Sequence, residues 1–99
     1  MKTIDAVRIL GALAQETRLE IFRLLVRRGQ KGMAAGELSE HFKMPPATMS
    51  FHLKELSNAG LIASRRESRS IIYAANYGCM QSLMGFLLEN CCVEDGGQC

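Results

Sequence analysis

The 99-residue sequence predicts a mostly α-helical domain that carries a single β-hairpin. Three observations support this prediction. Apolar residues recur at helical spacing in four stretches before Gly60, and they do so again in residues 77–90. Between these regions the pattern changes to two β-prone runs. A short polar segment, residues 67–69, separates the two runs, which is typical of a hairpin.

Length and composition place the chain among single-domain globular proteins. Hydrophobic residues make up 47% of the sequence, and no apolar run approaches the roughly 18–20 residues that a membrane span requires. The N-terminus lacks the layout of a signal peptide, so we expect a cytoplasmic protein. In that compartment the four cysteines are expected to be reduced thiols or metal ligands, not structural disulfides.

The charge is unevenly distributed along the chain. The formal net charge is +2, but residues 89–99 contain Glu89, Glu94 and Asp95 and no cation. The first 88 residues therefore carry twelve cations against seven anions. A basic body with an acidic, cysteine-bearing tail favours nucleic-acid binding by the body, although an excess of this size is common in proteins of other functions.

The first three predicted helices support the rest of the domain. Residues 4–13 form a short helix with one apolar face, which needs tertiary packing to be stable. Residues 17–28 are apolar on more than one side, which predicts the central helix. Two arginines at its negative pole and Gly29 end this helix. Residues 30–33 are expected to be a loop, and residues 34–42 a short third helix.

The fourth predicted helix, residues 46–58, is the reading element of a helix-turn-helix. Proline is accepted at a first helical position, and Gly60 is suited to stop the helix. Residues 43–45 join it to the third helix, which gives the helix-turn-helix layout. One side of the helix is apolar. The other side has small and polar residues at its N-terminal end and a cation further along the helix, a pattern that suits entry into a DNA major groove. An ordinary amphipathic surface helix is the alternative.

The β-hairpin follows the reading helix directly, and the combination predicts a winged helix-turn-helix fold. The two β-prone runs are residues 61–66 and 70–74. Arg65, Arg66 and Arg69 make the hairpin tip basic, so we expect them to lie along DNA phosphates or to reach the minor groove. A solvated basic surface without DNA contact is the alternative.

The last predicted helix, residues 77–90, carries an apolar stripe at helical spacing, and the first helix carries a similar one. We expect the domain to dimerise through its first and last helices. A dimer must match two reading helices to half-sites about 34–36 Å apart. The alternative is that both stripes pack only on the domain's own core.

The sequence resembles the ArsR/SmtB family of winged-helix metalloregulatory repressors. The segments that carry the resemblance are residues 13–21 (LAQETRLEI), 37–38 (EL), 49–56 (MSFHLKEL), 59–62 (AGLI), the wing segment 65–69 (RRESR) and Tyr73. The resemblance implies a homodimeric, DNA-binding transcriptional repressor, not an enzyme, that an inducer releases from its operator. Two features depart from the family pattern: Ser68 stands where the wing turn usually has glycine, and Pro46-Ala47 stand where polar residues are common.

The helical faces and the resemblance together define the expected DNA contacts. Phe51 or Thr48 is expected to touch thymine methyl groups, because the reading helix begins with apolar residues. His52 lies at the edge of the apolar stripe and is expected to pack or to approach a phosphate, not to bind a metal. The complete predicted set is Ala47, Thr48, Ser50, Phe51, His52, Lys54, Arg65, Arg66 and Arg69.

The cysteines decide which inducer the resemblance implies. The family's first-described arsenic sensors carry a C-x-C pair before the reading helix, but residues 33–38 contain no cysteine. The family's zinc sensors carry Asp and His ligands on the last helix, which has no histidine in this chain. The remaining candidates, Cys91, Cys92 and Cys99, resemble those of the arsenic- and antimony-responsive branch with C-terminal thiols.

Three thiolates favour a soft ion of low coordination number. They fall short of the four ligands of a structural zinc site, whereas three sulfurs suit trivalent arsenic or antimony. We therefore expect residues 1–90 to bind DNA and dimerise, and residues 91–99 to bind arsenite or antimonite as inducer. Cys79 is expected to be a small core residue, with a fourth-ligand role as the alternative. Thiol redox or persulfide sensing, another soft-metal inducer, a tail without a specific function and a thiol-based reductase remain alternatives.

Overall fold

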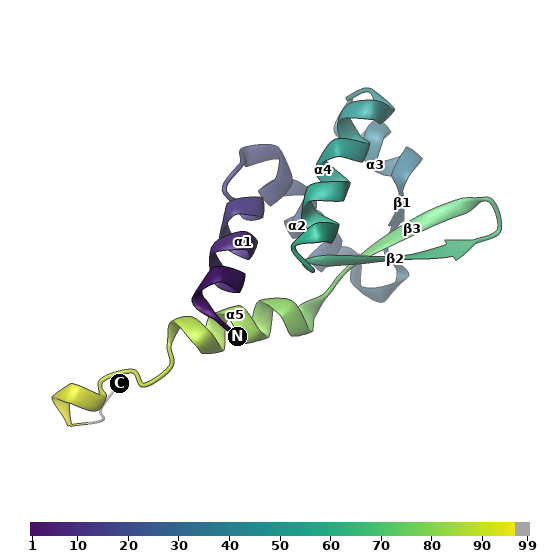
Figure 1. Cartoon of the computed structure of the whole chain (residues 1–99). Helices are drawn as coiled ribbons and strands as arrows, with labels where there is room; N and C mark the ends of the chain where they lie inside the picture. Colours follow the sequence, from purple (N-terminus) through teal and green to yellow (C-terminus); the bar gives the residue numbers. More distant parts are fainter. Residues whose placement is uncertain (97–99) are drawn as a thin grey trace.

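The computed structural model describes residues 1–96. Over these residues the chain folds into five α-helices, a three-stranded antiparallel sheet and two short 3₁₀ turns (Figure 1). The elements are α1 (Thr3–Leu13), α2 (Glu16–Arg28), η1 (Gly29–Lys31), β1 (Met33–Ala34), α3 (Ala35–His41), α4 (Pro46–Asn58), β2 (Ile62–Glu67), β3 (Ser70–Ala75), α5 (Tyr77–Leu87) and η2 (Val93–Asp95).

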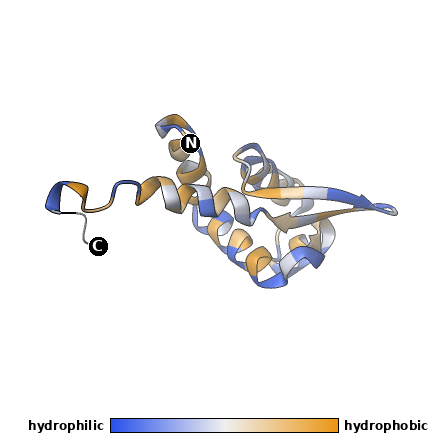
Figure 2. Ribbon diagram, turned by 90° about the horizontal axis from the view of Figure 1, so that it is seen from below, coloured by the Kyte–Doolittle hydropathy of each residue, from blue (hydrophilic) through white to orange (hydrophobic). Residues whose placement is uncertain are grey.

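The hairpin and the last helix extend in opposite directions from a helical body. Figure 1 shows α1, α2, α3 and α4 packed together, with β2 and β3 projecting from one side and α5 from the other. Figure 2 shows the same elongated arrangement from below, with a hydrophilic tip on the hairpin. The winged helix-turn-helix fold predicted from the sequence is confirmed.

Helix α2 lies at the centre of the core, as the sequence predicts. Ile21 and Leu25 on this helix are fully buried. They belong to one apolar cluster with Leu38 of α3 and with Leu53 and Leu56 of α4. Burying a side chain of this size contributes about 1.5–3 kcal/mol before entropic costs. The cluster therefore fixes the reading helix α4 on the support formed by the other helices.

The C-terminal end of α2 also holds the last helix. Tyr77, the first residue of α5, donates a hydrogen bond from its hydroxyl to the carbonyl oxygen of Val26 at 3.1 Å. Asn76 caps α5 by accepting a hydrogen bond from the Cys79 N–H at 3.4 Å. Its side-chain amide donates to the carbonyl oxygen of Gly60 at 2.9 Å. Helix α5 is thus attached both to α2 and to the end of the reading helix.

Helix α4 begins and ends where its sequence predicts. Pro45 precedes the helix in an extended conformation, and Pro46 is its first residue. At the other end, Gly60 has a φ of 80°. The Leu61 N–H donates to the carbonyl oxygen of Leu56 at 3.0 Å, which closes the last turn. The glycine stop therefore ends the helix and directs the chain into β2.

The sheet has one more strand than the sequence predicts. Its order is β1-β3-β2, and the short β1 pairs antiparallel with β3 through Met33 with Tyr73 and Ala34 with Ile72. The expected loop at residues 30–33 is therefore partly wrong. A two-residue strand has too few positions to show a periodic pattern, so only its pairing with β3 defines it.

Gly32 brings β1 close to the neighbouring strand. Its φ is 63°, and a Cβ atom added there would lie 2.2 Å from the carbonyl oxygen of Tyr73. Gly32→Ala is therefore expected to lower the free energy of unfolding by about 1–3 kcal/mol, measured by urea unfolding.

A matched glycine substitution controls for side-chain addition itself. A Cβ at Gly11 in α1 would meet no atom within 4 Å among the described residues. Gly11→Ala is expected to leave stability unchanged or to raise it by up to about 1 kcal/mol. Equal unfolding midpoints for Gly32→Ala and the wild type would contradict the close strand contact.

Helix α5 ends at Leu87, three residues before the predicted end at residue 90. Asn90 has a φ of 60°, a left-handed conformation that asparagine tolerates and that cannot continue a helix. Leu87 and Leu88 are exposed, whereas Phe86 still packs against the core, so the described residues cover only one side of the end of this helix. None of the helices described over residues 1–96 combines the length and the apolar character needed to cross a membrane.

Candidate nucleic-acid interface

Helix α4 presents two different faces. Met49, Leu53 and Leu56 are buried in the core. The exposed face contains five members of the predicted DNA-contact set: Ala47, Thr48, Ser50, Phe51 and Lys54. The small and hydroxyl-bearing residues come first on this face and the cation follows a turn later. Such a face fits the width of a major groove and offers donors, acceptors and apolar surface to base edges.

Phe51 is the largest apolar side chain on this face. It is 55% exposed, although burial of an aromatic side chain of this size usually stabilises the folded protein. Its ring makes an edge-on contact with the His52 ring at a centroid distance of 5.6 Å. The exposed ring lies on the helix surface, where it can meet a thymine methyl group.

His52 differs from the other predicted contacts on α4 because it is buried. Its exposed fraction is 8%, and its Nδ1 atom has no hydrogen-bond partner among the described residues. Burial lowers the pKa of its imidazole, and the nearby Arg18 guanidinium lowers this pKa further. A ring this buried offers little surface to a phosphate. The burial therefore favours the packing role of His52 over the phosphate approach, and its DNA contact stays a prediction.

Acidification is expected to destabilise the fold through His52. Its folded-state pKa lies below the ordinary value of 6.5, so the unfolded chain binds this proton more readily. The free energy of unfolding should therefore fall as the pH drops through about 6.5 toward the lower folded-state pKa. Unfolding measurements between about pH 8 and pH 5 should show a smaller fall in His52→Leu than in the wild type.

The other histidine offers a control for this pH experiment. His41 is exposed near the end of α3. His41→Leu removes one imidazole but keeps His52, so it should retain the fall of the wild type at acid pH. Identical pH profiles for the wild type and His52→Leu would contradict the assignment.

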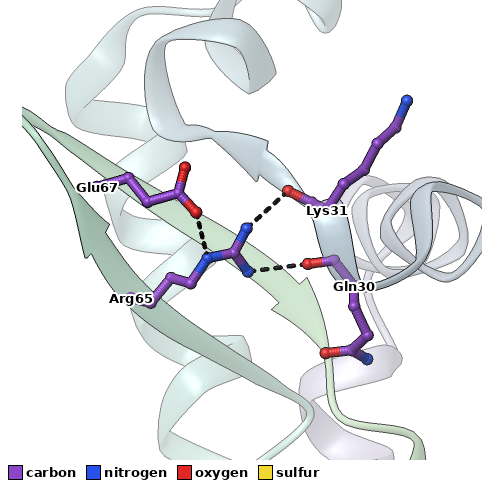
Figure 3. A network of polar contacts seen from close by, with 4 residues as sticks. All are labelled: Gln30, Lys31, Arg65 and Glu67. Atoms are coloured by element: carbon purple, nitrogen blue, oxygen red, sulfur yellow. Dashed lines mark hydrogen bonds and ion pairs between the residues drawn. The ribbon is translucent and has the colours of Figure 1, made fainter.

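The three wing arginines are not equivalent. Arg66 and Arg69 are exposed, and no hydrogen bond or ion pair with another described residue holds either guanidinium. Arg65 instead binds to the protein: it contacts Glu67 and the backbone carbonyls of Gln30 and Lys31 (Figure 3). Arg65 thus makes contacts within the fold that the sequence does not predict, and its contact with a phosphate stays a prediction.

The cysteines lie in two different surroundings. Cys79 on α5 is half-buried against the core, and its Sγ lies 3.8 Å from the carbonyl oxygen of Ala59. Burial raises the pKa of the Cys79 thiol, which favours the uncharged form. Cys79 thus packs against the core as predicted, although it is only partly buried.

Cys91 and Cys92 follow the end of α5, with their Sγ atoms 3.3 Å apart. Cys92 has a φ of 61°, so the chain turns at this residue. Within residues 1–96 there is no group of three or more His, Cys, Asp or Glu side chains placed to hold a metal ion. The third predicted ligand, Cys99, lies outside the described residues.

Helices α1 and α5 expose apolar side chains that the rest of the described chain does not cover. The exposed residues on α1 are Ile4, Val7 and Leu10, and those at α5 are Met84, Leu87 and Leu88. Both helices bury other side chains in the core, among them Ile9 and Leu83. Each apolar stripe is therefore only partly buried in the domain's own core. Its exposed residues form an apolar surface away from the wing.

Comparisons with known proteins agree with this arrangement. Residues 13–65 match a family model described as a helix-turn-helix domain. YceK of Bacillus subtilis, an uncharacterized HTH-type transcriptional regulator, is 39% identical over 80 residues, which cover 80% of this chain and 79% of that protein. The arsenical resistance operon repressor of Staphylococcus aureus is 32% identical over 76 residues, which cover 77% of this chain and 70% of that protein. The chain belongs to the ArsR family of winged-helix transcriptional regulators.

Solved structures of ArsR-type proteins share the fold. An ArsR-like transcriptional regulator from Rhodococcus sp. RHA1 has a TM-score of 0.77 and 26% identity, covering 92% of this chain and 82% of that one. A homodimeric winged helix-turn-helix DNA-binding domain from Mycobacterium bovis has a TM-score of 0.70 and 26% identity, and the match covers 86% of this chain and 77% of that one. This ArsR-family chain is a DNA-binding transcriptional regulator, and the relatives it matches are regulators, not enzymes.

Proposed function

We propose that the protein is a homodimeric repressor that trivalent arsenic or antimony releases from duplex operator DNA. Helix α4 and the wing bind the DNA in the cytoplasm, and thiolates of Cys91, Cys92 and Cys99 bind the inducer. The observation that carries the DNA-binding part is the exposed small and polar face of α4 beside a basic wing. The name of the staphylococcal relative, an arsenical resistance operon repressor, supports repression and this class of inducer.

The exposed apolar residues of α1 and α5 support the homodimer. Soluble monomers rarely leave large contiguous apolar patches uncovered, and a twofold interface places the same patch of each subunit against its copy. The mycobacterial relative with the same fold is homodimeric. Pairing through α1 and α5 leaves α4 and the wing of each protomer uncovered for two DNA half-sites.

On DNA, the exposed face of α4 enters the major groove and the wing follows the phosphate backbone. Thr48, Ser50 and Lys54 offer hydrogen bonds to base edges and phosphates, and Phe51 offers apolar contact. Ala47 allows close approach at the start of the helix. Beyond these residues, the wing contributes the charges of Arg66 and Arg69 to phosphates.

The position of the tail cysteines supports the choice of inducer. In the reduced protein, thiolates are soft ligands, and two sulfurs as close as those of Cys91 and Cys92 suit one soft trivalent ion. Both residues lie beyond the end of α5, so the direction of helical side chains does not keep them apart. Ordering of the tail at the end of a dimer helix shifts the two protomers and misaligns the reading helices, with a coupling energy of about 1–3 kcal/mol.

Release from DNA by arsenite tests this proposal. The probe is the duplex upstream of the protein's own gene, in a gel-shift experiment with reduced protein and with arsenite, antimonite, zinc or peroxide added. Arsenite is expected to release the wild type and Cys79→Ser, but not the variant with Cys91, Cys92 and Cys99 all replaced by serine. Release of the triple variant by arsenite would contradict inducer binding by the tail cysteines. Failure of the wild type to bind the duplex would contradict the proposed role in DNA regulation.

The 3.3 Å separation of the Cys91 and Cys92 sulfurs also favours a second candidate, thiol redox sensing. Peroxide would take the two thiol hydrogens and be reduced to water, while the sulfurs join in a disulfide. Intact-mass measurement separates the two candidates. Oxidation lowers the mass by two hydrogens, whereas arsenic adds its own mass and leaves again with a competing dithiol.

A further inference from the structure

The wing contains a polar network that DNA contact does not explain. Arg65 of β2 donates from Nε to Glu67 Oε2 at 2.6 Å (Figure 3). Its Nη1 donates to the Gln30 carbonyl oxygen at 2.8 Å, and its Nη2 donates to the Lys31 carbonyl oxygen at 3.1 Å. The two carbonyls belong to η1, which lies 35 and 34 residues earlier in the chain. One side chain thus joins the wing to the segment that follows α2.

The strand register shows how far this side chain reaches. Arg65 pairs with Ile72 of β3, and Ile72 pairs on its other side with Ala34 of β1. Directly paired residues of an antiparallel sheet place their side chains on the same face. Arg65 therefore extends from the outermost strand across β3, on the face of Ile72, to the segment leading into β1. We call this connection the Arg65 strap.

The chemistry of the strap is specific to arginine. A guanidinium is planar and offers N–H groups in several fixed directions, so it can serve two successive carbonyls and a carboxylate together. A lysine ammonium carries the same charge at a single point and cannot span the three acceptors. The ion pair also neutralises Glu67, which would otherwise place a carboxylate beside the phosphates that the wing approaches.

We propose that Arg65 is a positioning residue for DNA binding. The strap fixes the direction of the wing relative to α2 and η1, so that Arg66 and Arg69 reach phosphates while α4 occupies the major groove. This inference rests on the proposed contact of the wing with DNA. Residue 66 follows residue 65 on β2, so its side chain lies on the opposite face of the sheet. Arg65 therefore orients the wing, and Arg66 contacts the phosphates.

Substitutions at two neighbouring arginines test the strap. The variants are Arg65→Lys, Arg65→Gln, Arg66→Lys and Arg66→Gln, with Arg69→Gln as a second contact variant. Affinity for the duplex upstream of the protein's own gene is measured over a series of salt concentrations. Amide hydrogen exchange of the wing is measured on the same proteins without DNA, because it reports local opening independently of binding.

The two positions are expected to respond differently. Arg66→Gln should reduce the slope of log affinity against log salt by about 0.9, the value for one lost phosphate contact, and Arg66→Lys should restore it. Arg65→Lys and Arg65→Gln should both weaken binding roughly tenfold with an unchanged salt slope, since each loses a charge-assisted contact without losing a phosphate. Both should also speed amide exchange in the wing.

Two results would overturn the inference, and they are distinguishable. If Arg65→Lys binds and exchanges like the wild type while Arg65→Gln loses salt slope, Arg65 is a phosphate contact and the strap has no positioning role. If Arg66→Gln and Arg69→Gln both keep the affinity and slope of the wild type, the wing does not contact DNA, and the proposed interface fails together with the strap.

Discussion

Met84→Glu is expected to convert the dimer into a monomer and to weaken binding of the upstream duplex by roughly 10²–10⁴-fold. Met84 is 55% exposed on α5 within the proposed dimer surface. A carboxylate there would lose its water on dimerisation without gaining a partner. The two half-sites would then be bound separately, and the gain from linking two binding events would be lost. Analytical ultracentrifugation and gel shift measure the two effects.

Ser82→Glu is the matched control for this prediction. Ser82 is exposed on the same helix but lies well away from the apolar stripe, and the substitution adds the same charge. It should remain dimeric and should bind DNA within a few-fold of the wild type. A dimeric Met84→Glu protein would show that α5 is not the dimer surface, and the homodimer would then need a different interface.

Leu25→Ala is expected to lower the free energy of unfolding by about 2–5 kcal/mol. Leu25 lies on α2, has no exposed surface and belongs to the core cluster. Its truncation removes buried methyl groups and leaves a cavity between the helices that hold α4. The loss is large against the roughly 5–15 kcal/mol that stabilises a typical domain. Urea unfolding at a fixed protein concentration measures it.

The same helix provides the same substitution at its surface. Leu19 is 41% exposed on α2, so Leu19→Ala should change stability by less than about 1 kcal/mol. A loss at Leu25 no larger than that at Leu19 would contradict the central position of α2 in the core. A parallel loss of DNA binding in Leu25→Ala, at concentrations where it stays folded, would indicate displacement of α4.

The reading helix was predictable because its boundaries depend on local chemistry. Pro46 and Gly60 act through their own backbone conformations, and the inner and outer faces follow from the helical period. The burial of Met49 and the exposure of Phe51 both agree with that period. The hairpin was predictable for a similar reason, since its two strands are adjacent in sequence and share one short turn.

Features that depend on distant parts of the chain were not predictable. The role of Arg65 depends on backbone carbonyls more than thirty residues away, and a carbonyl leaves no mark in the sequence. His52 lies near the edge of the apolar stripe, where a small rotation of the helix decides between burial and exposure. Strand β1 exists only through its pairing with β3. In each case the local sequence pattern is compatible with more than one structure, and contacts with distant parts of the chain decide between them.

The C-terminal end of α2 has a consequence for evolution and engineering. The Val26 carbonyl oxygen accepts a hydrogen bond from the Tyr77 hydroxyl of α5. A few residues later, two carbonyl oxygens of η1 accept hydrogen bonds from the Arg65 guanidinium of the wing. The spacing between these two anchors is set by the number of residues that separate Val26 from Gln30 and Lys31. An exposed connection normally tolerates insertions. Here one added residue would shift the wing relative to α5, so relatives should vary in length at the tip of the wing and not in this connection.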